Sequence, residues 1–178
     1  MAQTNARREV GAAAGVLLAA AVLTGLAAQA PQKPLPRFED YRADAAFKGS
    51  PAAVVTEGSK LARTYRTRLR EGAAKGPNFA GRFTLVSWGC GASCQEWAVV
   101  DARTGQVSEW MIRTSVGAEF RADSRLLLVD TPKLAAEAFG GKVPANCTDC
   151  GTPGAYEWRD GAWHAVSGFG STHVHRFE

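Results

Sequence analysis

The chain has 178 residues, of which 46% are hydrophobic and 21% are charged, and its formal net charge is +4 at pH 7. This positive balance is too small to indicate a nucleic-acid-binding protein, because such proteins carry dense clusters of Lys and Arg. The length is sufficient for one domain with a sizeable hydrophobic core.

Residues 1–30 have the layout of an export signal. Arg7 and Arg8 precede an almost unbroken apolar run over 11–28, which ends in small residues. The run is close to the lower length limit for a membrane span, so the segment contacts the membrane only if it stays uncleaved. The general secretory route is expected rather than the twin-arginine route, because the residues after the arginines match the longer motif weakly. Cleavage near the end of the run would give a periplasmic protein with a formal charge of +3.

Residues 31–56 are expected to form an extended lead-in to the domain. They begin with three prolines in six positions and have no sustained hydrophobic period. Phe38, Tyr41 and Phe47 are the apolar side chains that we expect to pack against the domain. The lead-in precedes a single domain over 57–178.

The first regular element is predicted over 57–76. Leu61, Tyr65 and Leu69 recur every four residues there, which is the spacing of an amphipathic helix. The helix is expected to end near Gly72 or Gly76.

From residue 81 onward, short segments rich in Val, Ile, Trp and Phe alternate with turn residues, which indicates β-strands. The expected strands are 82–88, 96–101, 106–112, 118–122, 125–130, 155–159 and 162–166. A short helix is expected over 132–140. Asp160-Gly161 is the strongest hairpin signal, and 102–105 suits a second turn. The sum is an α+β domain, with one N-terminal amphipathic helix followed by a mainly antiparallel meandering sheet or small sandwich of about seven strands.

The four cysteines form two closely spaced pairs. Cys90 and Cys94 lie in a glycine-rich segment that we interpret as a loop between two strands, and Cys147 and Cys150 lie in a later loop. The first pair is near a cysteine-protease pattern, but it has one residue too many between the cysteines. Four thiolates could also bind zinc, although oxidation competes with metal in an exported protein. Disulfides, structural or redox-active, are therefore the preferred interpretation.

Two disulfide pairings compete. Cross pairing between the two motifs would close a loop of over 50 residues, which would stabilise the fold by roughly 4 kcal/mol in the chain-entropy model. Local pairing closes very small loops and is favoured kinetically by proximity in sequence. We prefer local pairs, which would shape loops rather than hold the fold together.

Several other side chains are candidates for binding. Arg63, Arg66 and Arg70 lie on one stripe of the predicted helix, where they either cover apolar surface or dock an anionic partner. Trp88 belongs to a set of five tryptophans in strand-like segments, which either fill the core or form an exposed platform for sugar or peptide. Core packing is the expectation for these aromatic residues.

The C-terminal histidines could chelate a metal. His173 and His175 alternate, so on a strand both rings would share one face and could bind a metal together with His164 or a carboxylate. An exposed C-terminal strand is the simpler interpretation, and we prefer it. We predict no metal site and no cofactor.

The chain resembles a group of small uncharacterised exported proteins of Gram-negative bacteria. The resemblance rests on the segments GPNFAG over 76–81, WGCGASC over 88–94 and TGQV over 104–107, and it covers roughly residues 60–130. It implies a periplasmic location and carries no activity, substrate or catalytic residue. Because the shared motif contains both Cys90 and Cys94, the resemblance supports pairing them with each other.

We expect this domain to bind a ligand rather than to catalyse a reaction. The sequence has no serine-hydrolase elbow, no zinc-protease motif and no phosphate-binding glycine loop. The expected partner is either a periplasmic protein, in which case the domain would be an inhibitor or immunity-type factor, or an envelope glycan. The alternatives are a thiol–disulfide oxidoreductase that uses a cysteine pair and a zinc-binding structural module. A binding protein should have disulfides that resist reduction, whereas an oxidoreductase needs a labile one.

Overall fold

The computed structural model describes residues 33–170 and 172–178, and residues 33–178 belong to one compact unit. The expected export signal over 1–30 lies outside the described residues. Within the described ranges, no helix combines the length and the apolar character needed to cross a membrane.

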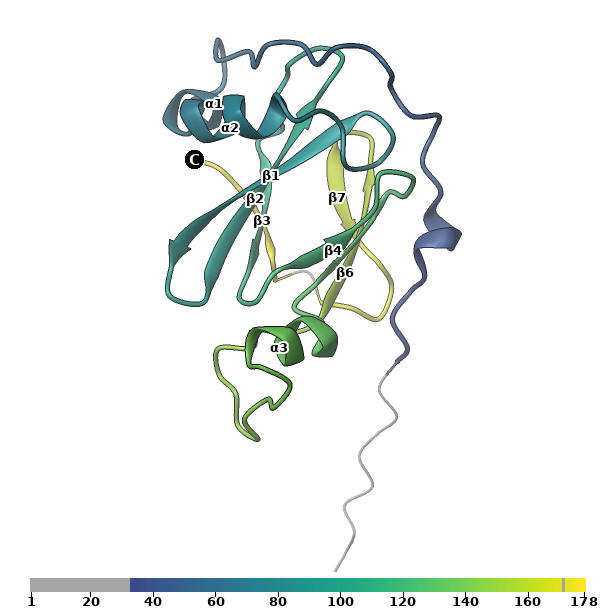
Figure 1. Ribbon diagram of the computed structural model, residues 1–178, viewed down its shortest axis with the longest axis vertical. Coiled ribbons are helices and arrows are strands. Elements are labelled where there is room, and N and C mark those ends of the chain that lie inside the picture. Colours follow the sequence, from purple (N-terminus) through teal and green to yellow (C-terminus); the bar gives the residue numbers. More distant parts are fainter. Residues whose placement is uncertain (1–32, 171) are drawn as a thin grey trace, which may run out of the picture. The chain divides into compact units, whose positions relative to one another are not determined.

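The described chain is mostly β, with eight strands in two antiparallel sheets (Figure 1). The first sheet has the order β1 (Phe83–Gly91), β2 (Cys94–Asp101), β3 (Trp110–Thr114) and β8 (Val174–Arg176). The second has the order β4 (Ala118–Phe120), β5 (Leu126–Val129), β6 (Gly154–Arg159) and β7 (Ala162–Ala165). The expectation of a mainly antiparallel β-rich fold is confirmed. β8 is the C-terminal strand that we preferred, but it is not exposed as expected: Val174 and His175 are half-buried, and His173 just before it is buried.

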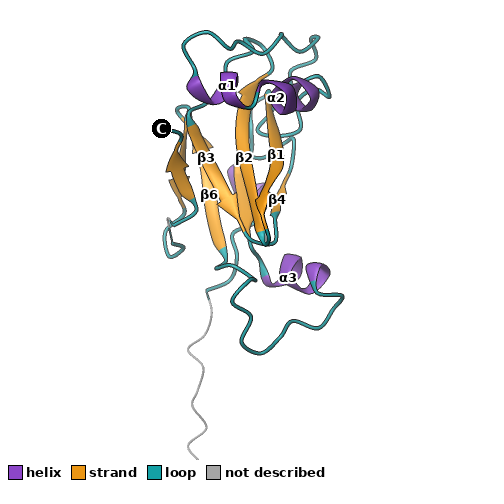
Figure 2. Ribbon diagram, turned by 90° about the vertical axis from the view of Figure 1, so that its left-hand side faces the viewer, coloured by secondary structure: helices purple, strands orange, loops and turns teal. Residues whose placement is uncertain are grey.

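Three hydrophobic clusters hold the fold together, and the smallest packs the lead-in against the second sheet. Between the sheets, buried side chains of both sheets interdigitate, among them Trp97, Ile112, Leu127 and Tyr156. The opposite face of the first sheet is covered by two helices, so that it is buried on both sides (Figure 2). This double burial explains why β2 is nearly continuously buried instead of alternating between buried and exposed residues.

The helix expected over 57–76 is instead two short helices, α1 (Lys60–Thr64) and α2 (Arg66–Ala73). Ser59 caps α1, because its side-chain oxygen accepts a hydrogen bond from the Ala62 N–H at 2.9 Å. The helix is interrupted at Tyr65, the residue between α1 and α2. The Tyr65 ring stacks on the Trp88 ring, with centroids 4.4 Å apart. The helical segment ends at Ala73, which agrees with the expected end near Gly72 or Gly76.

The predicted hairpins are present, with one shift of strand bounds. Asp160 and Gly161 both have positive φ between β6 and β7, as a two-residue hairpin turn requires. The strand expected to begin at residue 106 begins at Trp110. Val107 forms only an isolated bridge with Val100, and the chain is irregular between this bridge and β3.

The remaining elements are short. The lead-in contains a 3-10 helix over Phe38–Tyr41 and is hydrogen-bonded to the body of the domain, for example from the Ala43 N–H to the Asp123 carbonyl at 2.9 Å. The expected helix over 132–140 is α3 (Pro132–Ala138), and it is capped by the Thr131 side chain.

Candidate binding site

The segment over 88–97 is the tip of a hairpin rather than a loop. Strands β1 and β2 continue to the tip and are joined by Ala92 and Ser93, of which Ser93 has a positive φ of 46°. Cys90 and Cys94 form a disulfide across the tip, with Cα atoms 5.1 Å apart. The expectation of a loop between separate strands is therefore corrected. Glycines and a two-residue turn let the strands pair up to the end, with a shift of register between Gly89 and Gly91.

β1 is an edge strand that is covered along only part of its length. The Asn78 side chain imitates a neighbouring strand: its oxygen accepts the Leu85 N–H at 2.8 Å and its amide donates to the Leu85 carbonyl at 3.1 Å. At Phe83 the edge is covered by the backbone of Phe79, which exchanges two hydrogen bonds with the backbone of Phe83. Hydrogen-bonded and free pairs alternate along an antiparallel ladder, so the backbone groups of Ser87 and Gly89 also point away from β2. The described residues provide no hydrogen-bond partner for them.

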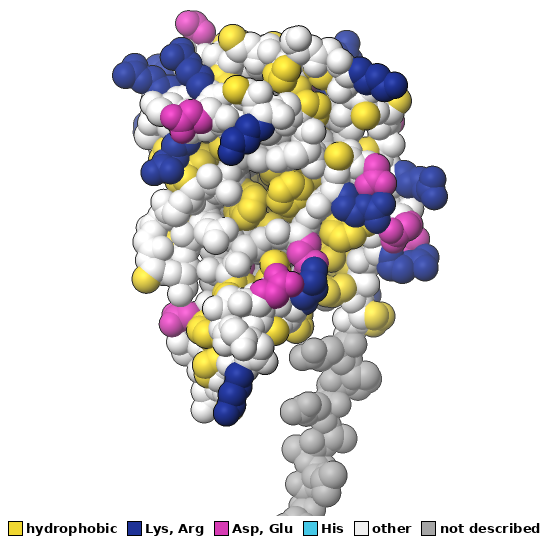
Figure 3. Space-filling model, in the orientation of Figure 1, with side chains coloured by type: hydrophobic (Ala, Val, Ile, Leu, Met, Phe, Trp, Pro, Cys, Tyr) yellow, Lys and Arg dark blue, Asp and Glu magenta, His cyan; other side chains and the backbone are white. Residues whose placement is uncertain are grey.

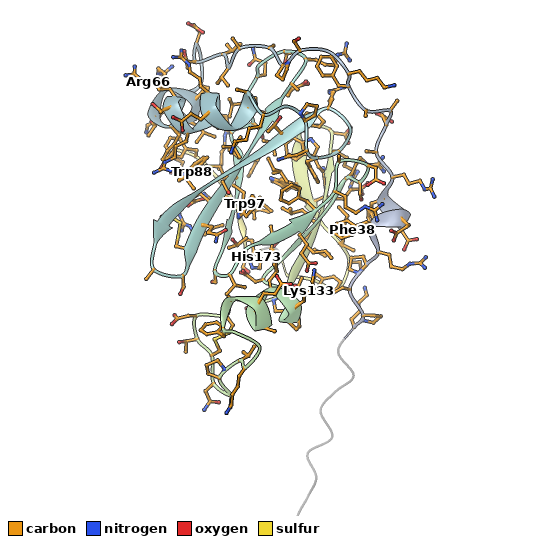
Figure 4. All side chains as sticks on the ribbon, in the orientation of Figure 1. Phe38, Arg66, Trp88, Trp97, Lys133 and His173 are labelled. Carbon is orange, nitrogen blue, oxygen red and sulfur yellow. A yellow bond between two sulfur atoms is a disulfide. The ribbon has the colours of Figure 1, made fainter. Side chains whose placement is uncertain are left out.

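A groove of about 340 Å³ lies beside this open edge. It runs between α2 and two edge strands, β1 of the first sheet and β4 of the second. Trp97 and Phe120 contribute aromatic surface, and Arg68, Glu71 and Lys75 contribute charged groups. The full lining is Arg68, Glu71, Gly72, Lys75, Asn78, Leu85, Val86, Ser87, Trp97 and Phe120. Figure 4 places Trp97 near the centre of the domain, below the helices.

The helices above the groove are strongly basic. Residues 60–75 carry six basic side chains and one acidic side chain, Glu71. Among the ion pairs formed by the described residues, none involves these side chains. Figure 3 shows their positive charges gathered around the helices at one end of the molecule. An uncompensated positive surface next to this groove suits an acidic partner.

The structure redistributes the predicted binding residues. Arg63, Arg66 and Arg70 are all exposed on the helices, but the basic side chains that line the groove are Arg68 and Lys75. The i, i+3 and i+4 spacing of residues 68, 71, 72 and 75 is the signal that could have found this face.

Trp88 is a core residue rather than part of a platform. It is 5% exposed and stacks under Tyr65, whereas Trp97, on the opposite face of the sheet, lines the groove. Four of the five tryptophans are buried, and Trp110 is 39% exposed. This distribution does not form a surface of several exposed aromatic rings.

The second cysteine pair is also a local disulfide. Cys147 and Cys150 have Cα atoms 5.5 Å apart, in the irregular segment between α3 and β6. The next residue, Gly151, has a φ of 68°, and a Cβ there would lie 2.2 Å from the Asp130 carboxylate. All four cysteines are thus bonded, in two pairs that lie in separate turns.

Asp130 organises the end of β5. Its buried carboxylate accepts hydrogen bonds from the backbone N–H groups of Ser115, Val116 and Gly117. Its other oxygen lies 3.5 Å from Nε2 of His173. The carboxylate therefore ties together the two loops that flank the second sheet.

The C-terminal histidines contact two different carboxylates. Nδ1 of His173 lies 2.7 Å from the Tyr156 hydroxyl, which donates to the Gly170 carbonyl. Nε2 of His175 lies 3.2 Å from Glu96, a buried carboxylate that also pairs with Arg113. The two rings do not converge on one point as the metal-site alternative requires. Within the described part of the chain, no group of three or more His, Cys, Asp or Glu is arranged to bind a metal ion.

Comparisons of this chain with protein-family models, with curated proteins and with solved structures find no match.

Proposed function

We propose that this protein is an exported binding module that recognises a partner protein through the groove beside β1. The observation that carries the proposal is the combination of an open strand edge, a groove of about 340 Å³ and a basic helical surface at one place. The partner, the target of an inhibitor or immunity-type factor, is expected to be acidic at its contact, because the surface beside the groove is basic.

Burial and charge support a protein ligand over a glycan. Glycan sites commonly use exposed aromatic rings for stacking, and here Trp88 and Trp97 are buried to more than nine-tenths. The groove instead combines a small aromatic surface with backbone groups that have no hydrogen-bond partner among the described residues, which suits a polypeptide ligand. Long-range attraction between the basic helices and an acidic partner would raise the association rate.

Thiol–disulfide exchange receives less support from the positions of the cysteines. Reactive cysteines in such enzymes sit at the start of a helix, where the dipole lowers the thiol pKa. Cys90 and Cys94 flank a hairpin turn, and Cys147 and Cys150 lie in an irregular segment after α3. Both disulfides serve in this proposal as local supports of the backbone.

Site-specific photo-crosslinking in the periplasm tests the proposal. A photoreactive residue at Glu71, in the groove, should give a discrete protein adduct, whereas one at Glu137 on α3 should not. The double variant R68E/K75E should abolish the adduct at residue 71, because it reverses both positive charges in the groove. The identified partner should then bind the purified domain in calorimetry, with an affinity that falls as salt concentration rises.

Equal adducts from residues 71 and 137 would contradict the proposal, and so would an adduct at residue 71 that survives the charge reversal. Circular dichroism of R68E/K75E provides the folding control, since both side chains are exposed. The matched substitution K142E, at an exposed position after α3, changes charge away from the groove and should leave the adduct unchanged.

A further inference from the structure

We infer that the partner is bound by strand addition: an extended acidic segment pairs its backbone with β1 at Ser87 and Gly89 and becomes a fifth strand of the first sheet. This inference rests on the proposed function and specifies its mode of recognition. It also gives the sequence pattern that the bound segment must have.

The first argument concerns the backbone of β1. An edge strand exposes a row of N–H and C=O groups that can pair with another chain, and proteins usually cover or distort such edges. Here the cover is partial. Phe79 and Asn78 occupy the edge at Phe83 and Leu85, and the edge is open from Ser87 onward. The two-point contact of Asn78 with Leu85 is the pairing that an added strand would continue.

The second argument concerns access. Ser87 is exposed, and a Cβ placed on Gly89 would meet no atom within 4 Å. The Cys90–Cys94 disulfide fixes the hairpin just beyond these residues. An edge that is held in extended geometry before binding loses less conformational entropy when a strand is added.

The third argument concerns side chains, which alternate between the two faces of any added strand. One face of a strand beside β1 would lie towards α2, near Arg68 and Lys75. The other face would lie towards the aromatic surface of Trp97 and Phe120. The bound segment should therefore alternate acidic and apolar residues.

A display experiment tests this pattern before the natural partner has been identified. A library of random 12-residue peptides is selected for binding to the mature domain at low salt. Enriched peptides should share a stretch in which acidic and apolar residues alternate. Synthetic copies are then measured by fluorescence polarisation against the wild-type domain and its variants.

The decisive variant is Ser87→Pro. The Ser87 N–H points away from β2, so proline removes no hydrogen bond of the existing ladder, and edge strands tolerate proline at such positions. The ring blocks pairing with an added strand, and we expect affinity to fall at least ten-fold. Ser87→Ala, which keeps the N–H, should lose far less affinity than Ser87→Pro.

Peptide chemistry provides a second test that leaves the domain unchanged. N-methylation removes one backbone N–H at a time along the selected peptide. Strand addition predicts that methylation weakens binding at every second position and is tolerated at those between. Loss of affinity without this period of two would overturn the inference even if Ser87→Pro failed to fold.

The outcomes separate the inference from the proposed function. If R68E/K75E abolishes binding while Ser87→Pro has no effect, the groove binds a partner but strand addition is wrong. If no peptide is enriched, strand addition is also wrong, and the crosslinking experiment still decides the proposed function.

A second copy of this chain is the competing occupant of the edge. Sedimentation velocity over a range of concentrations distinguishes it. We expect a monomer, because net positive charge on the helices beside the edge opposes pairing of two copies. A dimer that Ser87→Pro dissociates would assign the edge to self-association and would overturn the inference.

Discussion

At the scale of single residues, this fold depends on a few buried polar groups with several partners each. Asp130 is the clearest case, because its carboxylate accepts three backbone N–H groups and approaches His173. Its φ of 47° is tolerated by aspartate more readily than by most other residues. A buried carboxylate with this many donors is a structural anchor, and it needs no catalytic role.

Replacing Asp130 with asparagine should destabilise the protein by about 3 kcal/mol, because charge-assisted hydrogen bonds are lost and amide hydrogens face buried donors. Urea unfolding followed by tryptophan fluorescence measures the change in free energy. Asp149→Asn is the matched control, since that side chain is exposed and is expected to change stability little. Similar effects of the two substitutions would show that Asp130 is not an anchor.

Tyr156 gives a prediction about alkaline pH. Burial raises the pKa of its hydroxyl above the usual value, which is about 10. Above that pH the unfolded chain loses the tyrosine proton while the folded chain retains it. The contribution of Tyr156 to stability is therefore complete below pH of about 10 and is lost as pH rises further.

The Tyr156→Phe variant should show a weaker fall in unfolding free energy between neutral and strongly alkaline pH. It should also lose about 1 kcal/mol at neutral pH, because the hydrogen bond to the Gly170 carbonyl disappears. Urea titrations at a series of pH values measure both effects. Parallel pH profiles of the variant and the wild type would contradict the assignment.

At the scale of elements, the close packing of α2 on β1 depends on a glycine inside the helix. A Cβ on Gly72 would lie 2.5 Å from a methyl carbon of Val86. Alanine is favoured over glycine within a helix by about 1 kcal/mol, but overpacking here should cost more. We expect Gly72→Ala to destabilise the domain.

The same substitution should become stabilising when Val86→Ala is already present, because the clash is removed and the helix preference remains. A double-mutant cycle from urea unfolding measures this reversal of sign. Glu71→Ala serves as a control in the same helix, at an exposed position. If Gly72→Ala changes stability in the same direction with and without Val86→Ala, then α2 and β1 separate easily enough to accommodate the added Cβ.

The Cys90–Cys94 disulfide should matter more for binding than for stability. It closes a loop of five residues, so its removal in C90S/C94S should lower the unfolding free energy by about 2 kcal/mol at most. The larger effect should be on the affinity for a selected peptide, because the open edge of β1 would no longer be fixed in C90S/C94S. The variant C147S/C150S, changed away from the groove, should keep its affinity.

At the scale of the whole molecule, the two disulfides bear on the compartment in which the protein folds. Two disulfides are compatible with an oxidising compartment, and the predicted export signal would lead there. The basic helices lie at one end of the described unit, with the groove beside them (Figure 3).

Thiol alkylation tests the compartment. Protein isolated from the periplasm and unfolded without reductant should not react at any of its four cysteines, whereas all four should react after reduction. Mass spectrometry of the intact protein counts the adducts, and its mass also locates the start of the mature chain. Reactive thiols in the periplasmic protein would favour the redox or zinc alternatives.

The sequence by itself determined the local features of this protein: the Asp160-Gly161 hairpin, most strand positions and the proximity of the cysteines in each pair. Turn residues and hydrophobic periods act over a few residues, so they are readable in the chain. The tertiary structure decided which surfaces are free. The break at Tyr65, the cover that Asn78 gives to β1 and the separate roles of Trp88 and Trp97 depend on contacts between elements, because burial is set by what packs against each face.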